Sequence, residues 1–146
     1  MIDPKSITIY NRYFHGLPPF PPSVRYEATV IRGCHYEDEV LTNPDSGGRP
    51  TIGQTATVLI PVDADQSGKT YVKSEQYANM PNDTTNYWTA NKDPTNPDYF
   101  IFGEGRELND LYTIESLKRD HRVFAIQGVA DSWESGIQPH LEITGI

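Results

Sequence analysis

The C-terminal end of the chain reads as two strands joined by a polar turn, and it limits the possible folds more than any other segment. The first arm, 123–130, is apolar at nearly every position, which is typical of a strand buried on both faces. The second arm alternates, with Leu141, Ile143 and Ile146 at its apolar positions, so one face should lie on a core. Residues 131–139 supply the turn. Because two strands alone are marginal in water, this antiparallel hairpin should dock on a sheet formed by the rest of the chain.

Composition narrows the fold class. Twelve Pro and eleven Gly in 146 residues leave few windows in which three helical turns could form. Hydrophobic residues make up 36% and aromatic residues 11%, a balance that suits a small β-core with large polar loops. We therefore predict an all-β fold in a single domain over 1–146, a small antiparallel β-barrel or sandwich with at most one short helix. That helix is expected at 108–119, where Leu111, Ile114 and Leu117 recur at helical spacing.

Short runs of β-branched and aromatic residues predict the remaining strands. Residues 7–14 read as an edge strand, and Gly33 should cause a bulge or bend in a long strand at 24–40. Residues 56–62 are very apolar and are the candidate for the central strand. Further strands are predicted at 69–74 and 98–105, and long exposed loops at 41–50 and 75–97, the second pinned to the core by Trp88.

The charge and the single cysteine exclude several classes of function. A formal net charge of −8 argues against wrapping DNA or binding an anionic membrane, since both need a positive surface. It is compatible with a wall along which DNA slides without sticking. Cys34 has no second cysteine to pair with, which excludes an internal disulfide and fits a reducing compartment. Asp3 and Pro4 stand where a signal peptide would need an apolar run, and no window reaches the length of a membrane span.

One segment resembles the start of a calcium-binding loop. Residues 63–68 read DADQSG, and Asp63, Asp65 and Ser67 could supply oxygen ligands. An EF-hand would need Glu at the twelfth loop position, where this chain has Ser74. A β-turn with Asx-type hydrogen bonds is therefore favoured, and the three residues stay weak metal candidates.

No residue pattern predicts catalysis. His35, Glu37 and Glu39 would share one strand face, but a solvated face explains that alternation better than a metal site does. Cys34 and His35 are neighbours in a strand and point to opposite faces, so they cannot act as nucleophile and base. We expect no enzyme activity and no cofactor, and the proline-rich stretch 17–22 is interpreted as a stiff connector.

Several segments taken in order resemble one family. They are ITIYNRYF from Ile7, TVIRG from Thr29, TATVLIPVDAD with GKTYV over 55–72, Trp88 followed by DYFIFGEG, and the terminal IQGVADSWESGIQPHLEITG. The family consists of small proteins from the head-to-tail gene cluster of tailed phages of Gram-positive bacteria, often labelled minor capsid or head-closure proteins. The matching segments span nearly the whole chain.

The resemblance implies a structural virion protein with no catalytic role. It would be a head-closure or stopper subunit of the phage neck that joins portal or adaptor to tail and retains packaged DNA. It would be assembled in the host cytoplasm as a ring of six copies, through a heterologous interface that edge strands can form. Passing contact with genomic DNA is expected, and no membrane contact. The candidate partner contacts are Tyr10, Arg12, Tyr13, Pro19, Phe20, Arg49, Tyr77 and Tyr87.

Two alternatives stay open. Within the same class, the chain could be a tail-completion protein or a capsid decoration protein. In another class, the two Asp residues of 63–68 and the exposed aromatic residues would suit a β-sandwich module that binds calcium or carbohydrate. In the phage interpretation, 41–50 or 75–97 projects into the DNA channel or grips the neighbouring ring.

Overall fold

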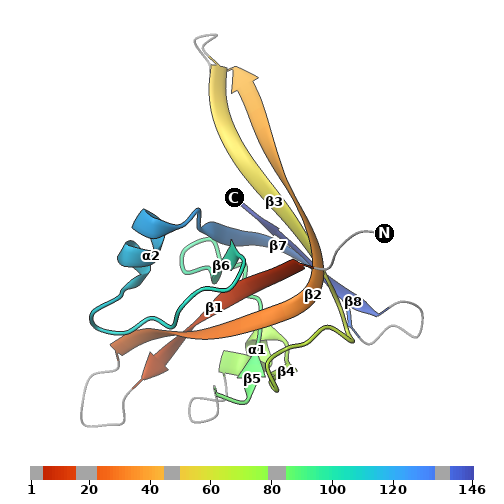
Figure 1. Ribbon diagram of the computed structural model, residues 1–146, viewed down its shortest axis with the longest axis vertical. Helices are drawn as coiled ribbons and strands as arrows, with labels where there is room; N and C mark the ends of the chain where they lie inside the picture. The colour runs from red at the N-terminus through yellow and green to blue at the C-terminus, as the bar shows by residue number, and fades with distance from the viewer. Residues whose placement is uncertain (1–4, 16–22, 45–49, 79–84, 134–138) are drawn as a thin grey trace.

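The fold is an antiparallel ring of six strands, which confirms the all-β prediction (Figure 1). The computed structural model describes residues 5–15, 23–44, 50–78, 85–133 and 139–146. Around the ring the order is β1-β2-β3-β8-β7-β6. The ring strands are β1 Lys5–His15, β2 Ser23–Pro44, β3 Pro50–Pro61, β6 Tyr99–Phe102, β7 Phe124–Ser132 and β8 His140–Gly145. The smaller elements are β4 Thr70–Tyr71, β5 Tyr87–Trp88, and the helices α1 Ser74–Ala78 and α2 Ile114–Asp120.

The ring is two sheets that share β2 and β7 rather than a uniform barrel. One sheet joins β2, β1, β6 and β7, and the other joins β2, β3, β8 and β7. β2 serves both because it bends at Gly33, which has φ +90. Ser6 lies opposite Arg32 and Lys5 lies opposite Cys34, so Gly33 is an unpaired extra residue. The predicted bulge is confirmed, and Gly tolerates the left-handed backbone that it requires.

The structure confirms the predicted position of β3 in the sheet and corrects that of β1. β3 pairs with β2 on one side and β8 on the other, so 56–62 was correctly predicted as a central strand. β1 was predicted to be an edge strand, and this was wrong, because it pairs with both β2 and β6. Its residues 7–11 are all buried. Both faces of β1 are covered, one by the barrel interior and the other by α2 and the segment before it.

The C-terminal hairpin forms as predicted, with β7 and β8 antiparallel. Leu141 and Ile143 are fully buried, but Ile146 is 46% exposed because Gly145 takes the next inward position. The expectation that 123–130 is buried on both faces was wrong. Val123, Phe124 and Ile126 are buried, whereas Ala130 at the other end of the segment is exposed. The outer apolar cluster reaches Val123 and no further along this strand, so nothing in that cluster covers the rest of its outer face.

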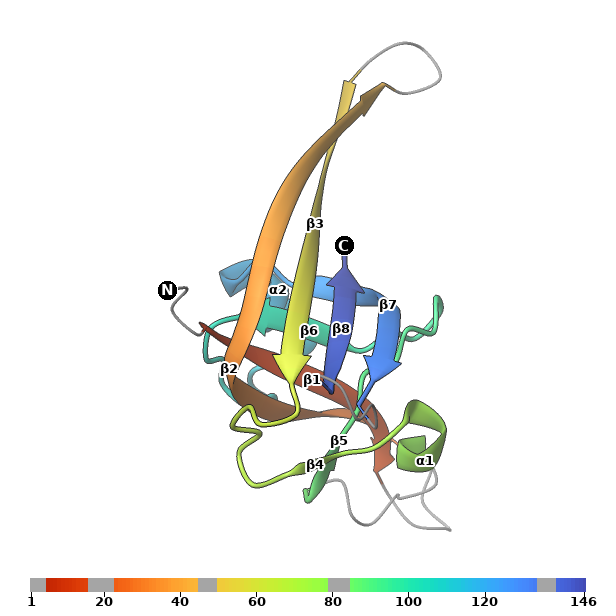
Figure 2. The ribbon, with the colours of Figure 1, turned by 90° about the vertical axis from the view of Figure 1, so that its right-hand side faces the viewer.

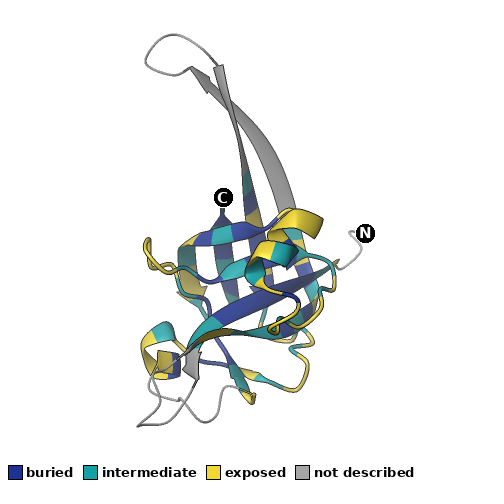
Figure 3. Ribbon diagram, turned by 90° about the vertical axis from the view of Figure 1, so that its left-hand side faces the viewer, coloured by how far each residue is buried: buried dark blue, intermediate teal, exposed yellow. Residues whose placement is uncertain are grey.

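Two apolar clusters hold the molecule together, and Figure 3 shows how buried residues gather on the ring strands. The inner cluster fills the barrel. The outer cluster lies on β1 and β6 and consists of Tyr10, Ile101, Tyr112, Leu117 and Val123. α2 supplies Leu117, its one buried residue.

The helices differ from the prediction in number and in position. The described part of the chain has two short helices rather than one. The predicted helix 108–119 begins only at Ile114, because Thr113 forms a capping box with Ser116. Leu111, expected on its apolar face, is 95% exposed. None of the described helices is both long enough and apolar enough to cross a membrane.

The described residues of the predicted loop 41–50, which are 41–44 and 50, belong to strands. β2 and β3 stay paired from Glu39 opposite Thr55 to Pro44 opposite Pro50. Residues 45–49 lie outside the described part of the chain. Over 50–55, β3 pairs with β2 alone, since its pairing with β8 begins at Ala56. We call residues 39–44 and 50–55 the arm; it is a two-stranded ribbon that projects beyond the barrel (Figures 1 and 2).

The second predicted loop, 75–97, is described at 75–78 and 85–97, and these residues are anchored to the core. It includes most of α1, and β5, which pairs in parallel with β4; the strand predicted at 69–74 is thus only β4. Trp88 is fully buried and its Nε1 donates to Gln66 Oε1 at 2.9 Å. Its ring also packs on Tyr71 and Trp133. The prediction that Trp88 is an anchor is confirmed.

Replacement of Gly145 by Ala should destabilise the fold. A Cβ at this position would lie 2.6 Å from a Phe100 ring carbon and 2.9 Å from Phe124 Cβ. Overpacking of this kind costs about 1–3 kcal/mol. The matched control is Gly128→Ala on the partner strand, where the nearest atom, Cβ of Thr144, would be 3.6 Å away. In urea unfolding, Gly145→Ala should lower the free energy of unfolding clearly more than Gly128→Ala does. Equal decreases for the two variants would contradict this packing.

Candidate functional site

The predicted partner contacts are not gathered in one place. Tyr10 and Tyr77 are buried, so they cannot present a surface and their assignment as contacts was wrong. Tyr10 instead packs in the outer cluster and donates to the carbonyl of Arg106 at 2.8 Å. Arg12, Tyr13 and Tyr87 are half-buried, whereas Pro19, Phe20 and Arg49 lie outside the described residues.

A buried polar cluster ties β1 to the segment that leads into β6. Asn11 Nδ2 donates to Asp98 Oδ2 at 2.8 Å and to the Thr89 carbonyl at 2.6 Å. Its Oδ1 accepts from the Thr89 N–H at 3.1 Å. Asp98 also accepts from the backbone N–H groups of Arg12 at 2.8 Å and Asn91 at 3.0 Å. Sequence reasoning missed this cluster, since an Asn inside an apolar strand was its only signal.

Burial raises the pKa of the Asp98 carboxyl from 3.8 to about 7. Its hydrogen bonds from Arg12, Asn11 and Asn91 oppose the rise because they favour the charged form. The cluster is enclosed: Asn11 and Asp98 are at most 1% exposed. It therefore serves the fold rather than a ligand.

The calcium-loop candidate is a turn that covers an edge of β2. Asp65 Oδ1 accepts from the Ser67 N–H at 3.0 Å, which is the predicted Asx-type bond. Asp65 also forms an ion pair with Arg32 at 3.6 Å, and their backbones exchange two hydrogen bonds of 2.8 Å. Asp63 is exposed. Among the described residues, no group of three or more His, Cys, Asp or Glu side chains could hold a metal.

Cys34 and His35 do not meet as a catalytic pair. Cys34 is buried and its Sγ donates to the Lys5 carbonyl at 3.0 Å. Burial raises the pKa of this thiol to about 11, so it stays protonated at neutral pH. His35 is exposed. The side chains of Glu37 and Glu39 lie outside the described part of the structure.

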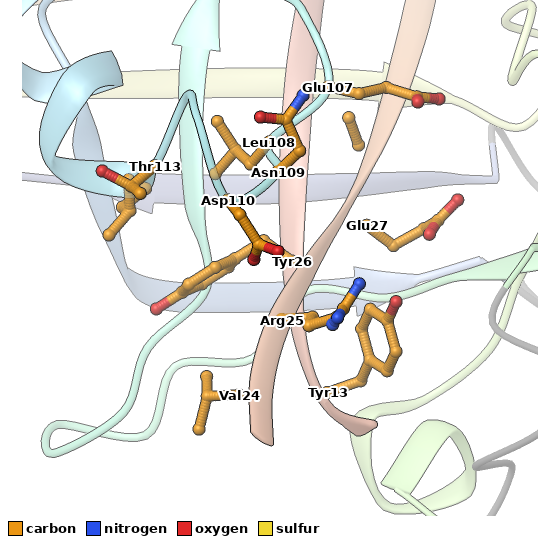
Figure 4. A pocket seen from close by; sticks show the side chains of 12 residues that line it. Tyr13, Val24, Arg25, Tyr26, Glu27, Glu107, Leu108, Asn109, Asp110 and Thr113 are labelled. Atoms are coloured by element: carbon orange, nitrogen blue, oxygen red, sulfur yellow. The ribbon is translucent and has the colours of Figure 1, made fainter. Parts of the chain in front are cut away.

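A groove runs beside the first half of β2, and Figure 4 shows the side chains of its walls. Its volume is about 330 Å³. One wall is β2 from Val24 to Ala28 with Tyr13 of β1, and the other is formed by 107–110 with Thr113 and Ile114. Glu27, Glu107 and Asp110 give it three carboxylates against the single guanidinium of Arg25. The groove is therefore open, acidic and partly apolar.

The far wall of the groove is held in place by β1. Thr8 Oγ1 donates to the Gly103 carbonyl at 2.9 Å and accepts from the Gly105 N–H at 2.7 Å. Farther on, Asn109 Oδ1 accepts from the N–H groups of Leu111 and Tyr112, both at 2.8 Å. These bonds fix a segment without regular secondary structure, so the groove is part of the fold.

A smaller cavity of about 220 Å³ lies on another part of the surface. Its lining combines Tyr71 and Trp133 with Lys73, Gln76 and Asp131. Tyr71 Oη donates to Asp131 Oδ2 at 2.8 Å, and the Tyr71 and Trp133 rings lie 5.1 Å apart. Aromatic rings beside polar groups suit a small polar ligand.

Asp98→Asn should destabilise the protein and change how its stability depends on pH. The new amide would place an NH₂ among three N–H donors, which costs about 1–3 kcal/mol. In the wild type the folded pKa of about 7 exceeds the unfolded value of 3.8, so stability from this group falls as pH rises between them. The difference in free energy of unfolding between wild type and Asp98→Asn should therefore become smaller from pH 4 to pH 7. Urea unfolding at each pH measures this difference.

The control for this experiment is Asp93→Asn, because Asp93 is exposed. At pH 4 this variant should lower the free energy of unfolding by less than Asp98→Asn does. A gap for Asp98→Asn that widens with rising pH would show that the carboxylate is favoured in the folded state, contrary to the raised pKa.

No curated protein and no solved structure matches the chain. A family model matches residues 2–146, which is nearly the full length. The chain therefore belongs to the family described as "Family of unknown function (DUF6751)".

Proposed function

We propose that the protein is a structural subunit of a tailed-phage neck, a head-closure or stopper protein that joins portal or adaptor to tail and retains packaged DNA. The observation that carries the proposal is the arm. A two-stranded ribbon is marginal in water, yet β2 and β3 stay paired from Glu39 opposite Thr55 to Pro44 opposite Pro50, beyond the reach of β8. A projecting arm of this kind suits contact with a neighbouring subunit or with DNA inside a ring.

The charge supports the same function. The net charge of −8 would keep the wall of a DNA channel from binding the genome. Exposed carboxylates at Asp63, Glu104, Glu107 and Asp110 belong to this excess. The segments that resemble head-closure proteins include the barrel strands β1, β3, β6, β7 and β8, so the resemblance concerns the core that carries the arm.

Within this class, tail completion and capsid decoration remain the alternatives. A second candidate function, carbohydrate binding, is favoured by one observation, the cavity with Tyr71, Trp133 and Asp131. Ring stacking of aromatic residues and a carboxylate acceptor would suit a sugar. A change in Trp fluorescence on adding simple sugars, with no response to portal particles, would favour it.

Shortening the arm should impair DNA retention or tail joining without unfolding the barrel. In this variant, residues 41–53 are replaced by Asn-Gly, which connects the paired residues Val40 and Gln54 by a tight turn. Particles assembled with the variant should release DNA or lack tails, whereas the purified variant should unfold at a temperature close to that of the wild type. DNA release is measured by nuclease sensitivity, and tails are counted by electron microscopy.

The native mass of the purified chain, alone and mixed with portal particles, provides the second readout. Rings, or assembly that depends on portal, would support a neck subunit and give the copy number. Normal DNA retention and normal tail joining by the shortened chain would contradict the proposed role of the arm. A monomer that ignores portal but melts at a higher temperature with calcium would favour the binding module.

A further inference from the structure

The first half of β2 has one paired edge and one edge that faces away from the barrel. Its inner edge pairs with β1 from Ser23 to Cys34. On the outer side, Arg32 exchanges both backbone hydrogen bonds with Asp65. The Val30 carbonyl accepts from Ser67 Oγ at 2.6 Å, and the Ala28 carbonyl accepts from Lys69 Nζ at 2.9 Å. In the part of β2 that precedes Gly33, the even-numbered residues therefore direct their backbone N–H and C=O groups to the outer side.

The contacts of Asp65, Ser67 and Lys69 with the outer edge of β2 end where the groove begins. The register with β1 is continuous from Arg32 back to Ser23, so the alternation continues and Tyr26 and Val24 also direct their N–H and C=O groups outward. Among the described residues, no backbone partner is found for these groups. The groove lies along these residues, with Val24 45% exposed. It is thus an open strand edge beside a fixed wall, a site that accepts an extended segment by strand addition.

The same chain carries a second unpaired edge of suitable length. Over 50–55 the outer edge of β3 has no strand partner among the described residues, and the sequence there, PTIGQT, contains no charged residue. Natural edges are usually blocked by charged side chains. The other strand of the arm begins at Glu39 and follows Glu37 and Asp38 directly, and the carboxylates of the groove would repel these acidic residues. The β3 edge therefore fits the acidic groove better.

We infer that the groove beside Val24–Ala28 binds the β3 edge of the arm from a second copy of this chain. The groove and the arm lie at opposite halves of β2, on either side of the bend at Gly33. Pairing is then head-to-tail, because each copy offers its arm to one neighbour and its groove to another. Such a heterologous interface closes into a ring or continues as a filament. The inference deepens the proposed function, since it specifies how subunits of a neck ring would join, but it can be tested without any other virion component.

The first test removes one outward donor. In Val24→Pro the missing N–H is one that β1 does not use, whereas Val24→Ala keeps the N–H and removes only the side chain. Sedimentation of the purified chain should show that the wild type and Val24→Ala self-associate. The dissociation constant of Val24→Pro should rise roughly tenfold or more. If Val24→Pro does not fold, Val24→Lys is used instead, because Lys blocks an open edge without altering the backbone.

The second test combines two defective chains. The arm-shortened chain keeps its groove and Val24→Pro keeps its arm, so each alone should be monomeric, and an equimolar mixture should form a one-to-one dimer. Self-association of Val24→Pro equal to that of the wild type, or a mixture that stays monomeric, would overturn the inference. A wild-type chain that is monomeric alone but loses portal binding on Val24→Pro would also overturn it, and would assign the groove to a strand of another protein. A wild-type chain that self-associates but does not bind portal particles would instead count against the neck function alone.

Discussion

The hydrogen bond between Asn11 and Asp98 is the constraint on which the rest of the structure depends. It joins the middle of β1 to the residue that precedes β6, and so it sets where β6 enters the ring. β6 shares only two residue pairs with β7, so this part of the ring has little strand pairing of its own. Each polar atom of the Asn11 and Asp98 side chains has a hydrogen-bond partner, so any shift would leave buried polar groups without partners.

The covering of strand edges explains the shape of the surface. The turn at Asp65–Lys69 covers the outer edge of β2 down to Ala28, and beyond that point no described residue supplies a backbone partner to Tyr26 or Val24. At the other end of β2, the arm extends past the barrel. Proteins usually protect such edges because they pair with other chains. Leaving two of them open on one chain is consistent with a subunit that assembles head-to-tail.

The parts of the fold that were predicted correctly depended on local patterns. The bulge at Gly33, the turn at 63–68, the anchor Trp88 and the C-terminal hairpin all followed from residue types at short spacing. The errors arose where distant segments decide. β1 became a central strand because β6, which is distant in sequence, pairs with its second edge, and turn residues in 41–50 hid the continuing ladder of the arm. The groove combines residues about eighty positions apart in sequence, so no local pattern could indicate it.

The sequence by itself determined which segments become strands, where β2 bends and the acidic character of the surface, because period, glycine and charge act through neighbouring residues. Only the tertiary structure decided which polar groups are buried and which strand edges stay open. Asp98 acquires a raised pKa from burial by segments far from it in the chain. Within the described part of the chain, the cover of the outer edge of β2 ends at Ala28, and no backbone partner reaches Val24. Both outcomes depend on long-range packing, which a one-dimensional pattern does not contain.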